Sequence, residues 1–300
     1  MFSPKSKIQN HLFMSSSVKI GLALSGGGAK GIMHIGVLRA LLENNIKPEI
    51  VSGTSAGSIV GAAYTAGYLP DDIEKMMGNT TWFKILRSVR MPGVGMIKMD
   101  YLHSRLQDII PRDNFEALKI PFYVCATNLN AGTAVIFNEG TLFDKVMASC
   151  AVPWLFKPIL IDGQMYADGG ITNNLPAKAI RDRCDILIGS NVKPKVRIDN
   201  NKELDSWMGI TQRCFELAMW SSVKQNVKVL DVYIAPEKVL DMSVFEIRRT
   251  KEMIEIGYEE TLLHIDDIHA LIKQKQKEKA HEKMAKTLNH HFDELSVEKK

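Results

Sequence analysis

A serine lies between two glycines in a short turn that follows an apolar run. Residues 50–52 are Ile-Val-Ser, and residues 53–57 read Gly-Thr-Ser-Ala-Gly with Ser55 at the centre. A serine becomes a nucleophile when a base takes its proton. The pattern G-x-S-x-G presents such a serine on a sharp strand-to-helix turn, for which Gly53 and Gly57 leave room. Short Gly-Ser strings also occur in ordinary turns, but the strand before and the helix after favour a catalytic Ser55.

A second glycine-rich turn precedes the serine. Residues 18–24 form a mostly apolar run, and the sequence Ser-Gly-Gly-Gly-Ala-Lys-Gly follows it. Gly26, Gly27 and Gly28 leave several backbone N–H groups unobstructed, which is what an oxyanion hole requires. Lys30 either adds positive charge near this site or is a solvated lysine in the first turn of a helix. The two turns together predict acyl-group chemistry.

The glycine-rich turn also has a rival interpretation as a nucleotide site. Gly26, Gly28 and Gly31 match the spacing of the dinucleotide fingerprint, after a strand and before a helix. That fingerprint needs an acidic residue at the end of the second strand. Glu49 has about the right spacing, but it precedes the apolar run 50–52. No Gly-Lys-Ser/Thr follows the glycines, which excludes a Walker-type phosphate loop. The oxyanion role is favoured, and a nucleotide-binding module stays as an alternative.

The base that would activate Ser55 is less obvious. A Ser-His-Asp triad needs a histidine after the serine. The candidates are His103, His264, His269, His281, His290 and His291, and we expect none of them at the end of a strand. His34 lies on the buried face of the first helix and is interpreted as structural. Asp168 is better placed, because Gly169 and Gly170 follow it in a tight turn, although such a string alone is more often only a turn. An aspartate that is hydrogen-bonded to the serine can act as the base directly.

Strands that alternate with helices must position these turns. The pattern predicts strands at 18–24, 50–52, 121–128, 134–137, 159–161, 165–167, 185–192 and 229–234. It predicts helices at about 29–44, 56–66, 144–151, 212–226 and 243–264. Such alternation favours an α/β fold with a mostly parallel sheet and helices on both faces. Residues 71–118 are either a lid across the mouth of the site or an ordinary helical insertion.

Composition and charge exclude several classes of protein. The chain has 300 residues, 45% apolar and 24% charged, enough for one large α/β domain. No apolar run approaches the ~20 residues of a membrane helix, and residues 1–17 lack the apolar core of a secretory signal. The net charge is +4, and residues 271–300 hold eight lysines against five acids. The remainder is nearly neutral and has no nucleic-acid footprint.

The cysteines indicate neither a metal site nor a disulfide framework. Cys125, Cys150, Cys184 and Cys214 are widely spaced and form no C-x-x-C pair. Each lies in an apolar or helix-like segment, so we expect free cysteines that behave as small core residues. A reducing, cytoplasmic location fits this usage. We expect no metal, and we see no acidic cluster that would hold one.

Four ordered blocks resemble the patatin-like phospholipase family, in its bacterial type. They are residues 25–31 (Ser-Gly-Gly-Gly-Ala-Lys-Gly), 53–57, 148–158 (Ala-Ser-Cys-Ala-Val-Pro-Trp-Leu-Phe-Lys-Pro) and 168–170. Their order and spacing fit the family over roughly residues 18–235. The first block begins with Ser25, where many plant members carry aspartate. Serine is common there in bacterial-type members, so this difference leaves activity little in doubt.

The resemblance implies a three-layer α/β/α domain that hydrolyses lipid acyl esters without a cofactor. It implies a serine–aspartate dyad of Ser55 and Asp168, and an oxyanion hole from residues 26–28 with a contribution from Ala29. The block that contains Pro153 would form a wall of the site. We expect a flexible leader at 1–17, an acyl hydrolase domain at 18–265 and a charged, helical or disordered tail at 266–300.

The substrate and its surroundings leave alternatives open. An acyltransferase would use the same dyad with an alcohol or thiol in place of water, and a scaffold without activity is a third possibility. The Met- and Trp-rich stretch 76–101 is a candidate acyl-chain lid or peripheral membrane contact. The lysine-rich tail is another candidate for contact with anionic headgroups. Its sparse apolar face favours a solvated helix instead.

Overall fold

A computed structural model gives the structure of most of the chain. It describes residues 18–78, 100–153, 155–192, 204–240, 242 and 248–297. The predicted leader at 1–17 and most of the candidate lid at 76–101 lie outside the described residues.

The described residues form one eight-stranded sheet with the order β5-β6-β3-β2-β1-β7-β8, and β4 pairs with β3. The strands are β1 (Ile20–Leu24), β2 (Pro48–Thr54), β3 (Phe122–Asn128), β4 (Thr133–Phe137), β5 (Ile159–Ile161), β6 (Gln164–Asp168), β7 (Ile186–Ser190) and β8 (Val232–Ile234). Five strands pair in parallel with one another, in the order β3-β2-β1-β7-β8. Strands β4, β5 and β6 pair antiparallel. The predicted α/β class with a mostly parallel sheet is confirmed.

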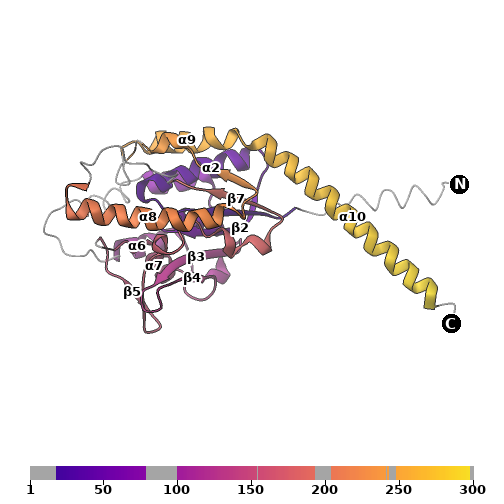
Figure 1. Cartoon of the computed structure of the whole chain (residues 1–300), viewed down its shortest axis with the longest axis horizontal. Helices are drawn as coiled ribbons and strands as arrows, with labels where there is room; N and C mark the ends of the chain where they lie inside the picture. Colours follow the sequence, from indigo (N-terminus) through magenta and orange to yellow (C-terminus); the bar gives the residue numbers. More distant parts are fainter. Residues whose placement is uncertain are drawn as a thin grey trace.

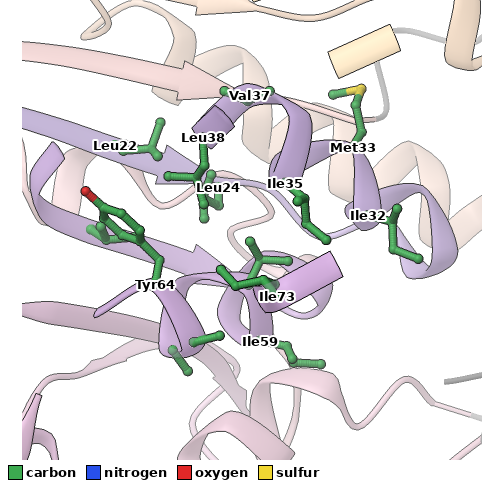
Figure 2. Close-up of a cluster of buried hydrophobic side chains, with 14 of the residues drawn as sticks. Leu22, Leu24, Ile32, Met33, Ile35, Val37, Leu38, Ile59, Tyr64 and Ile73 are labelled. Carbon is green, nitrogen blue, oxygen red and sulfur yellow. The ribbon is translucent and has the colours of Figure 1, made fainter. Parts of the chain in front are cut away.

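Both faces of the sheet are buried. Successive side chains of a strand point to opposite faces, and residues on both faces belong to apolar clusters. In β1, Leu22 and Leu24 join the larger apolar cluster, whereas Ala23 joins the smaller cluster on the other face. Strand β7 divides in the same way at Ile188 and Leu187. Figure 2 shows the larger cluster, in which β1 side chains lie against those of α2 (Met33–Glu43). The domain therefore has three layers, with helices on both sides of the sheet.

The remaining helices complete these layers. They are α3 (Ala56–Ala66), α4 (Pro70–Gly78), α6 (Asp100–Ile109), α7 (Phe143–Cys150), α8 (Trp207–Val227), α9 (Thr250–Leu262) and α10 (Ile265–Val297). Helix α9 lies along α2, and α10 leaves the globular body as a long projection (Figure 1). The smaller cluster contains Val223 of α8, which places α8 on the face opposite α2. None of the described helices combines the length and the apolar character that crossing a membrane requires.

Some details differ from the prediction. The first helix begins as a short 3-10 helix, η1 (Gly28–Ile32), before α2 starts. Helix α8 begins at Trp207 instead of 212, because the Ser206 hydroxyl accepts a hydrogen bond from the Gly209 N–H at 3.1 Å and caps it. Cys214 is exposed, so the expectation of four core cysteines is wrong at this position.

Candidate active site

Strands β2 and β6 meet end to end beside β3. Strand β4 occupies one edge of β3 from residue 124 to 128, so both β2 and β6 must pair with the other edge. On that edge Thr54 lies opposite Cys125, and Asp168 lies opposite Ala126. The two strands run toward each other, and their carboxyl ends meet there. Ser55 follows Thr54, the last residue of β2, and Asp168 is the last residue of β6. The two candidate residues therefore lie where these strand ends meet.

Ser55 occupies a strained turn between β2 and α3. Its φ of 52° and ψ of −123° are rare for a residue with a side chain, and such a conformation costs about 1–3 kcal/mol. The Ser58 hydroxyl donates to the Ser55 carbonyl at 2.6 Å. A Cβ atom on Gly57 would lie 2.5 Å from the Leu24 carbonyl oxygen. Only glycine fits at that position, as the G-x-S-x-G pattern predicts.

The end of α7 contacts both candidate residues. The Ser55 N–H donates to the Ser149 hydroxyl at 2.8 Å. The Asp168 N–H donates to the Ala151 carbonyl at 2.9 Å. Pro153 follows in a half-buried turn. The block at 148–158 was expected to form a wall of the site, and two of its residues bind the backbone of Ser55 and Asp168. The sequence alone did not predict this role for Ser149.

The Asp168 carboxylate is buried at the start of a tight turn. Asp168 is 1% exposed, and its Oδ1 accepts a hydrogen bond from the Gly170 N–H at 2.7 Å. The Thr127 hydroxyl donates to the Asp168 carbonyl at 2.8 Å. A Cβ atom on Gly169 would lie 2.3 Å from the Cys125 carbonyl oxygen, so the turn lies tight against β3. These contacts leave the Asp168 side chain little freedom.

The surroundings of the candidate residues are buried. Burial raises the pKa of the Cys125 thiol to about 12. Burial also raises the pKa of the Cys150 thiol, and the nearby Asp168 adds to this shift. Both groups therefore stay neutral thiols at neutral pH. Within the described residues, no cluster of three or more histidines, cysteines or acids could hold a metal ion.

The glycine-rich turn follows β1 beside Ser55. A Cβ atom on Gly26 would lie 2.9 Å from the Ser55 Cβ, which places the turn directly against the elbow. Gly28 opens η1 and has a φ of 60°, in the left-handed region. Gly27 caps η1, so the N–H groups of Gly27 and Gly28 precede its first intrahelical hydrogen bond. These groups can therefore serve a ligand.

Buried polar side chains fix the start of this turn. His34 Nε2 lies 2.9 Å from the Ser25 carbonyl oxygen, and Nδ1 lies 2.9 Å from the Ser190 hydroxyl. Because a carbonyl only accepts, the proton of His34 must lie on Nε2, and the Ser190 hydroxyl donates to Nδ1. The Val192 N–H donates to the Ser25 hydroxyl at 3.0 Å. The structural role predicted for His34 is confirmed.

Asn174 joins the glycine-rich turn to the turn after Asp168, and the sequence analysis did not single it out. Its carbonyl accepts from the Gly26 N–H at 3.1 Å, and its Nδ2 donates to the Gly26 carbonyl at 3.3 Å. A Cβ atom on Gly170 would lie 3.0 Å from its Oδ1. The position of Asn174 shortly after the Asp-Gly-Gly turn is the one sequence feature that could have indicated this role, and a polar residue after a turn is a weak indication.

The other predicted positions lie around the same turn or far from it. Ala29, Lys30 and Gly31 are buried within η1, and a Cβ atom on Gly31 would lie 2.3 Å from the Ala56 Cβ. Glu49 is exposed near the start of β2, at the opposite end from the glycine-rich turn. An acid at that end cannot reach a ribose bound at the turn, so the geometry does not favour the dinucleotide interpretation.

Comparisons with known proteins agree on one family. A family model described as "Patatin-like phospholipase" matches residues 22–180. An "Uncharacterized NTE family protein" of Mycobacterium tuberculosis is 36% identical over 168 residues, which cover 55% of this chain and 46% of that protein. "Lysophospholipase NTE1" of Kluyveromyces lactis is 29% identical over 183 residues, 59% of this chain and 13% of that protein. The chain thus spans about half the length of the mycobacterial relative, and less of the yeast protein.

Solved structures share the fold. VipD from Legionella pneumophila superimposes with a TM-score of 0.50 at 19% identity, over 84% of this chain and 68% of that chain. Human GIVD cytosolic phospholipase A2 superimposes with a TM-score of 0.50 at 11% identity, over 87% of this chain and 60% of that chain. At such low identity these likenesses show a common architecture.

Proposed function

The chain belongs to the patatin-like phospholipase family, and from that premise we propose that it is a serine-dependent lipid acyl hydrolase. Its substrates would be carboxylic esters of lipids, in reactions of the phospholipase A, lysophospholipase or esterase type. One observation carries the proposal: β2 and β6 run toward each other along one edge of β3, and Ser55 follows the end of β2 where β6 ends at Asp168. A nucleophile and a base on facing strand ends can work as a pair.

The proposed reaction proceeds through an acyl-enzyme. Ser55 Oγ attacks the ester carbonyl carbon while Asp168 takes the hydroxyl proton. Asp168 Oδ1 is engaged by the Gly170 N–H, so Oδ2 is the atom assigned to the proton. The carbonyl π electrons move to oxygen and return as the C–O bond breaks, and protonated Asp168 gives its proton to the leaving alcohol. A water then attacks the carbonyl carbon of the Ser55 ester while Asp168 takes a proton from it. The bond between that carbon and Ser55 Oγ breaks, Asp168 returns the proton to Oγ, and the fatty acid leaves.

The oxyanion formed in each step needs hydrogen-bond donors. Gly27 and Gly28 precede the first intrahelical bond of η1, and their N–H groups are assigned to this role. Gly26, whose own N–H binds the Asn174 carbonyl, shapes the turn. Ala29 is the fourth member that the family pattern suggests. Donors at the amino end of a helix also benefit from its dipole. Removing one such donor typically costs about 10²–10³ in kcat.

The test is fatty-acid release from lysophospholipid, phospholipid and a short-chain chromogenic ester, together with labelling by a fluorophosphonate. We expect Ser55→Ala and Asp168→Asn each to lower kcat by at least about 10³-fold, and Ser55→Ala to abolish labelling. Matched controls are Ser221→Ala, an exposed serine of α8, and Asp162→Asn, an aspartate in the β5–β6 turn. Activity that survives Ser55→Ala would contradict the proposal.

An acyltransferase remains the alternative on the same pair of residues. An alcohol or thiol would then replace water in the second step. Product analysis with an added alcohol separates the two: free fatty acid as the main product supports the hydrolase, and a new ester supports the transferase. The nucleotide-binding alternative would require binding of NAD or ATP without esterase activity.

We also propose peripheral contact with a membrane, through α8. Its outward residues Trp207, Ile210 and Leu217 are 72%, 50% and 49% exposed, and their spacing places them on one side of the helix. The opposite side of α8 approaches the candidate site, because a Cβ atom on Gly170 would lie 2.8 Å from Met219 Sδ. An apolar stripe beside a site for lipid esters suits a lipid surface. All four cysteines are free, which supports a cytoplasmic location.

A further inference from the structure

Asn174 is a buried amide that binds one peptide group of the glycine-rich turn. It is 1% exposed, and its Nδ2 donates to the Gly26 carbonyl at 3.3 Å across 148 positions of sequence. Its backbone carbonyl accepts from the Gly26 N–H at 3.1 Å. Its own N–H donates to the Ser222 hydroxyl at 2.9 Å, which ties the loop to α8. Asn174 thus binds Gly26 at two points while being held itself.

The contact with the Gly26 carbonyl sets the direction of the next N–H group. A trans peptide is planar, and its C=O and N–H point in opposite directions. With the Gly26 carbonyl directed at Asn174, the Gly27 N–H must point away from Asn174. Neither Gly26 nor Gly27 has a side chain to resist rotation of this peptide, and glycine tolerates both orientations. A rotated peptide would present a carbonyl where a donor is needed.

The amide oxygen of Asn174, Oδ1, lies in an unfavourable place for a polar atom. Among the described residues, the buried Oδ1 accepts no hydrogen bond. It lies in the space between the two turns, where a Cβ on Gly26 would be 2.6 Å away and one on Gly170 would be 3.0 Å away. Exchanging the amide N and O would direct an oxygen at the Gly26 carbonyl and would lose the hydrogen bond that Nδ2 donates to it. A leucine would avoid the cost of a buried, unsatisfied acceptor.

We propose that Asn174 is a positioning residue, which holds the Gly26–Gly27 peptide so that the Gly27 N–H is directed at the oxyanion. This inference rests on the proposed hydrolase function. It assigns the amide donor, and not the packing of the side chain, as the reason for asparagine at this position.

The first test compares Asn174→Leu with wild type on a chromogenic ester and with a fluorophosphonate. We expect kcat to fall about 10- to 100-fold, less than for direct loss of a donor, with KM within about threefold because the acyl-chain contacts remain. The rate of fluorophosphonate labelling should fall in parallel, since that reaction also develops charge on oxygen. The matched control is Asn173→Ala, whose side chain instead accepts from Asn226 Nδ2 at 3.0 Å. It should keep kcat within about twofold of wild type.

A second variant, Asn174→Asp, keeps the shape and tests the donor. Its ionised carboxylate cannot donate to the Gly26 carbonyl, whereas the protonated acid can. The ratio of variant to wild-type kcat should therefore rise as the pH is lowered, which a packing role would not produce. A pH-independent ratio, or wild-type kcat in Asn174→Leu beside an inactive Ser55→Ala, would overturn this inference alone. Full activity in Ser55→Ala would overturn the proposed function and this inference together.

Discussion

The histidine beside the glycine-rich turn is held neutral. Burial lowers the pKa of His34 from 6.5 to about 4, although the hydrogen bond to the Ser25 carbonyl opposes this shift. The groups bound to its ring, the Ser25 carbonyl and the Ser190 hydroxyl, carry no charge. The imidazole therefore donates from Nε2 and accepts at Nδ1 at neutral pH. Both ring nitrogens of His34 are engaged by these groups, so the imidazole is not available as a base for Ser55.

This burial predicts a dependence of stability on pH. Between pH 6.5 and about 4 the unfolded chain binds a proton at His34 that the folded chain does not. The free energy of unfolding should therefore fall as the pH drops through this window, by about 3 kcal/mol in total from this residue. Urea unfolding across pH 4–7 measures it.

The comparison with His34→Gln isolates this contribution from those of the carboxylates. The variant should be less stable at pH 7, because glutamine does not reproduce both ring contacts, but its stability should fall less steeply on acidification. Equal slopes in the two proteins between pH 4 and 6.5 would show that His34 does not titrate as expected.

Residues with a local signature were predictable, and those with only distant partners were not. Ser55 and Asp168 stand beside glycines that tight turns require, so the sequence alone indicates them. Asn174 and Ser149 bind groups 148 and 94 positions away. Such contacts depend on which strand ends and helix ends meet, and no pattern of neighbouring residue types encodes that. The roles of Ser55 and Asp168 in catalysis stay predictions until the variants are assayed.

At the scale of elements, α2 and α9 touch through their backbones. A Cβ atom on Gly36 of α2 would lie 1.9 Å from the Ile254 carbonyl oxygen, and one on Gly257 of α9 would lie 2.2 Å from the Met33 carbonyl oxygen. Two glycines therefore allow these helices to pack without side chains between them. Since α2 continues from η1, this contact also supports the helix that carries the glycine-rich turn.

Gly257→Val tests the contact. Valine favours a helix more than glycine does, so an isolated helix would gain stability. We expect the protein to lose about 3 kcal/mol of unfolding free energy instead, because α9 must move away from α2. Chemical denaturation measures the change.

The matched control is Glu255→Val, which places the same side chain on the exposed side of α9. It should change stability by no more than about 0.5 kcal/mol. If Gly257→Val were as stable as this control, the close approach of the two helices would be wrong.

Periodicity predicted which elements exist more reliably than where each begins. The strands at 50–52 and 134–137 both appear, lengthened to Pro48–Thr54 and Thr133–Phe137. The start of the first helix is wrong in type, since a 3-10 turn precedes α2. The end-to-end meeting of β2 and β6 was beyond prediction, because strand spacing along the chain does not say which edge of β3 each strand takes.

At the scale of the whole molecule, two surfaces extend beyond the compact core. One is the apolar stripe of α8, made of Trp207, Ile210 and Leu217. The other is α10, which projects from the body (Figure 1). The base of α10 belongs to the domain, since Ile265 and Ile268 are buried in the main core.

The ion pair between Lys279 and Asp185 at 2.5 Å extends this attachment further along α10. A truncation that tests the tail should therefore begin after Lys279 and not at residue 266. Removal of residues 281–300 leaves the attached part of the helix in place.

Flotation with vesicles of phosphatidylcholine and phosphatidylserine distinguishes the two surfaces. In the double variant Trp207→Ser/Leu217→Ser, the ratio of vesicle-bound to free protein should fall at least about tenfold, since burying each side chain in lipid contributes about 1.5–3 kcal/mol. The truncated protein should float like wild type. The removed tail would attract anionic lipid only through charges on a solvated helix, and salt screens such charges. Leu263→Ser, a change at a 75% exposed leucine between α9 and α10, is the matched control. The reverse pattern, with binding lost on truncation and kept in the double variant, would assign membrane contact to the tail and leave the α8 stripe without that role.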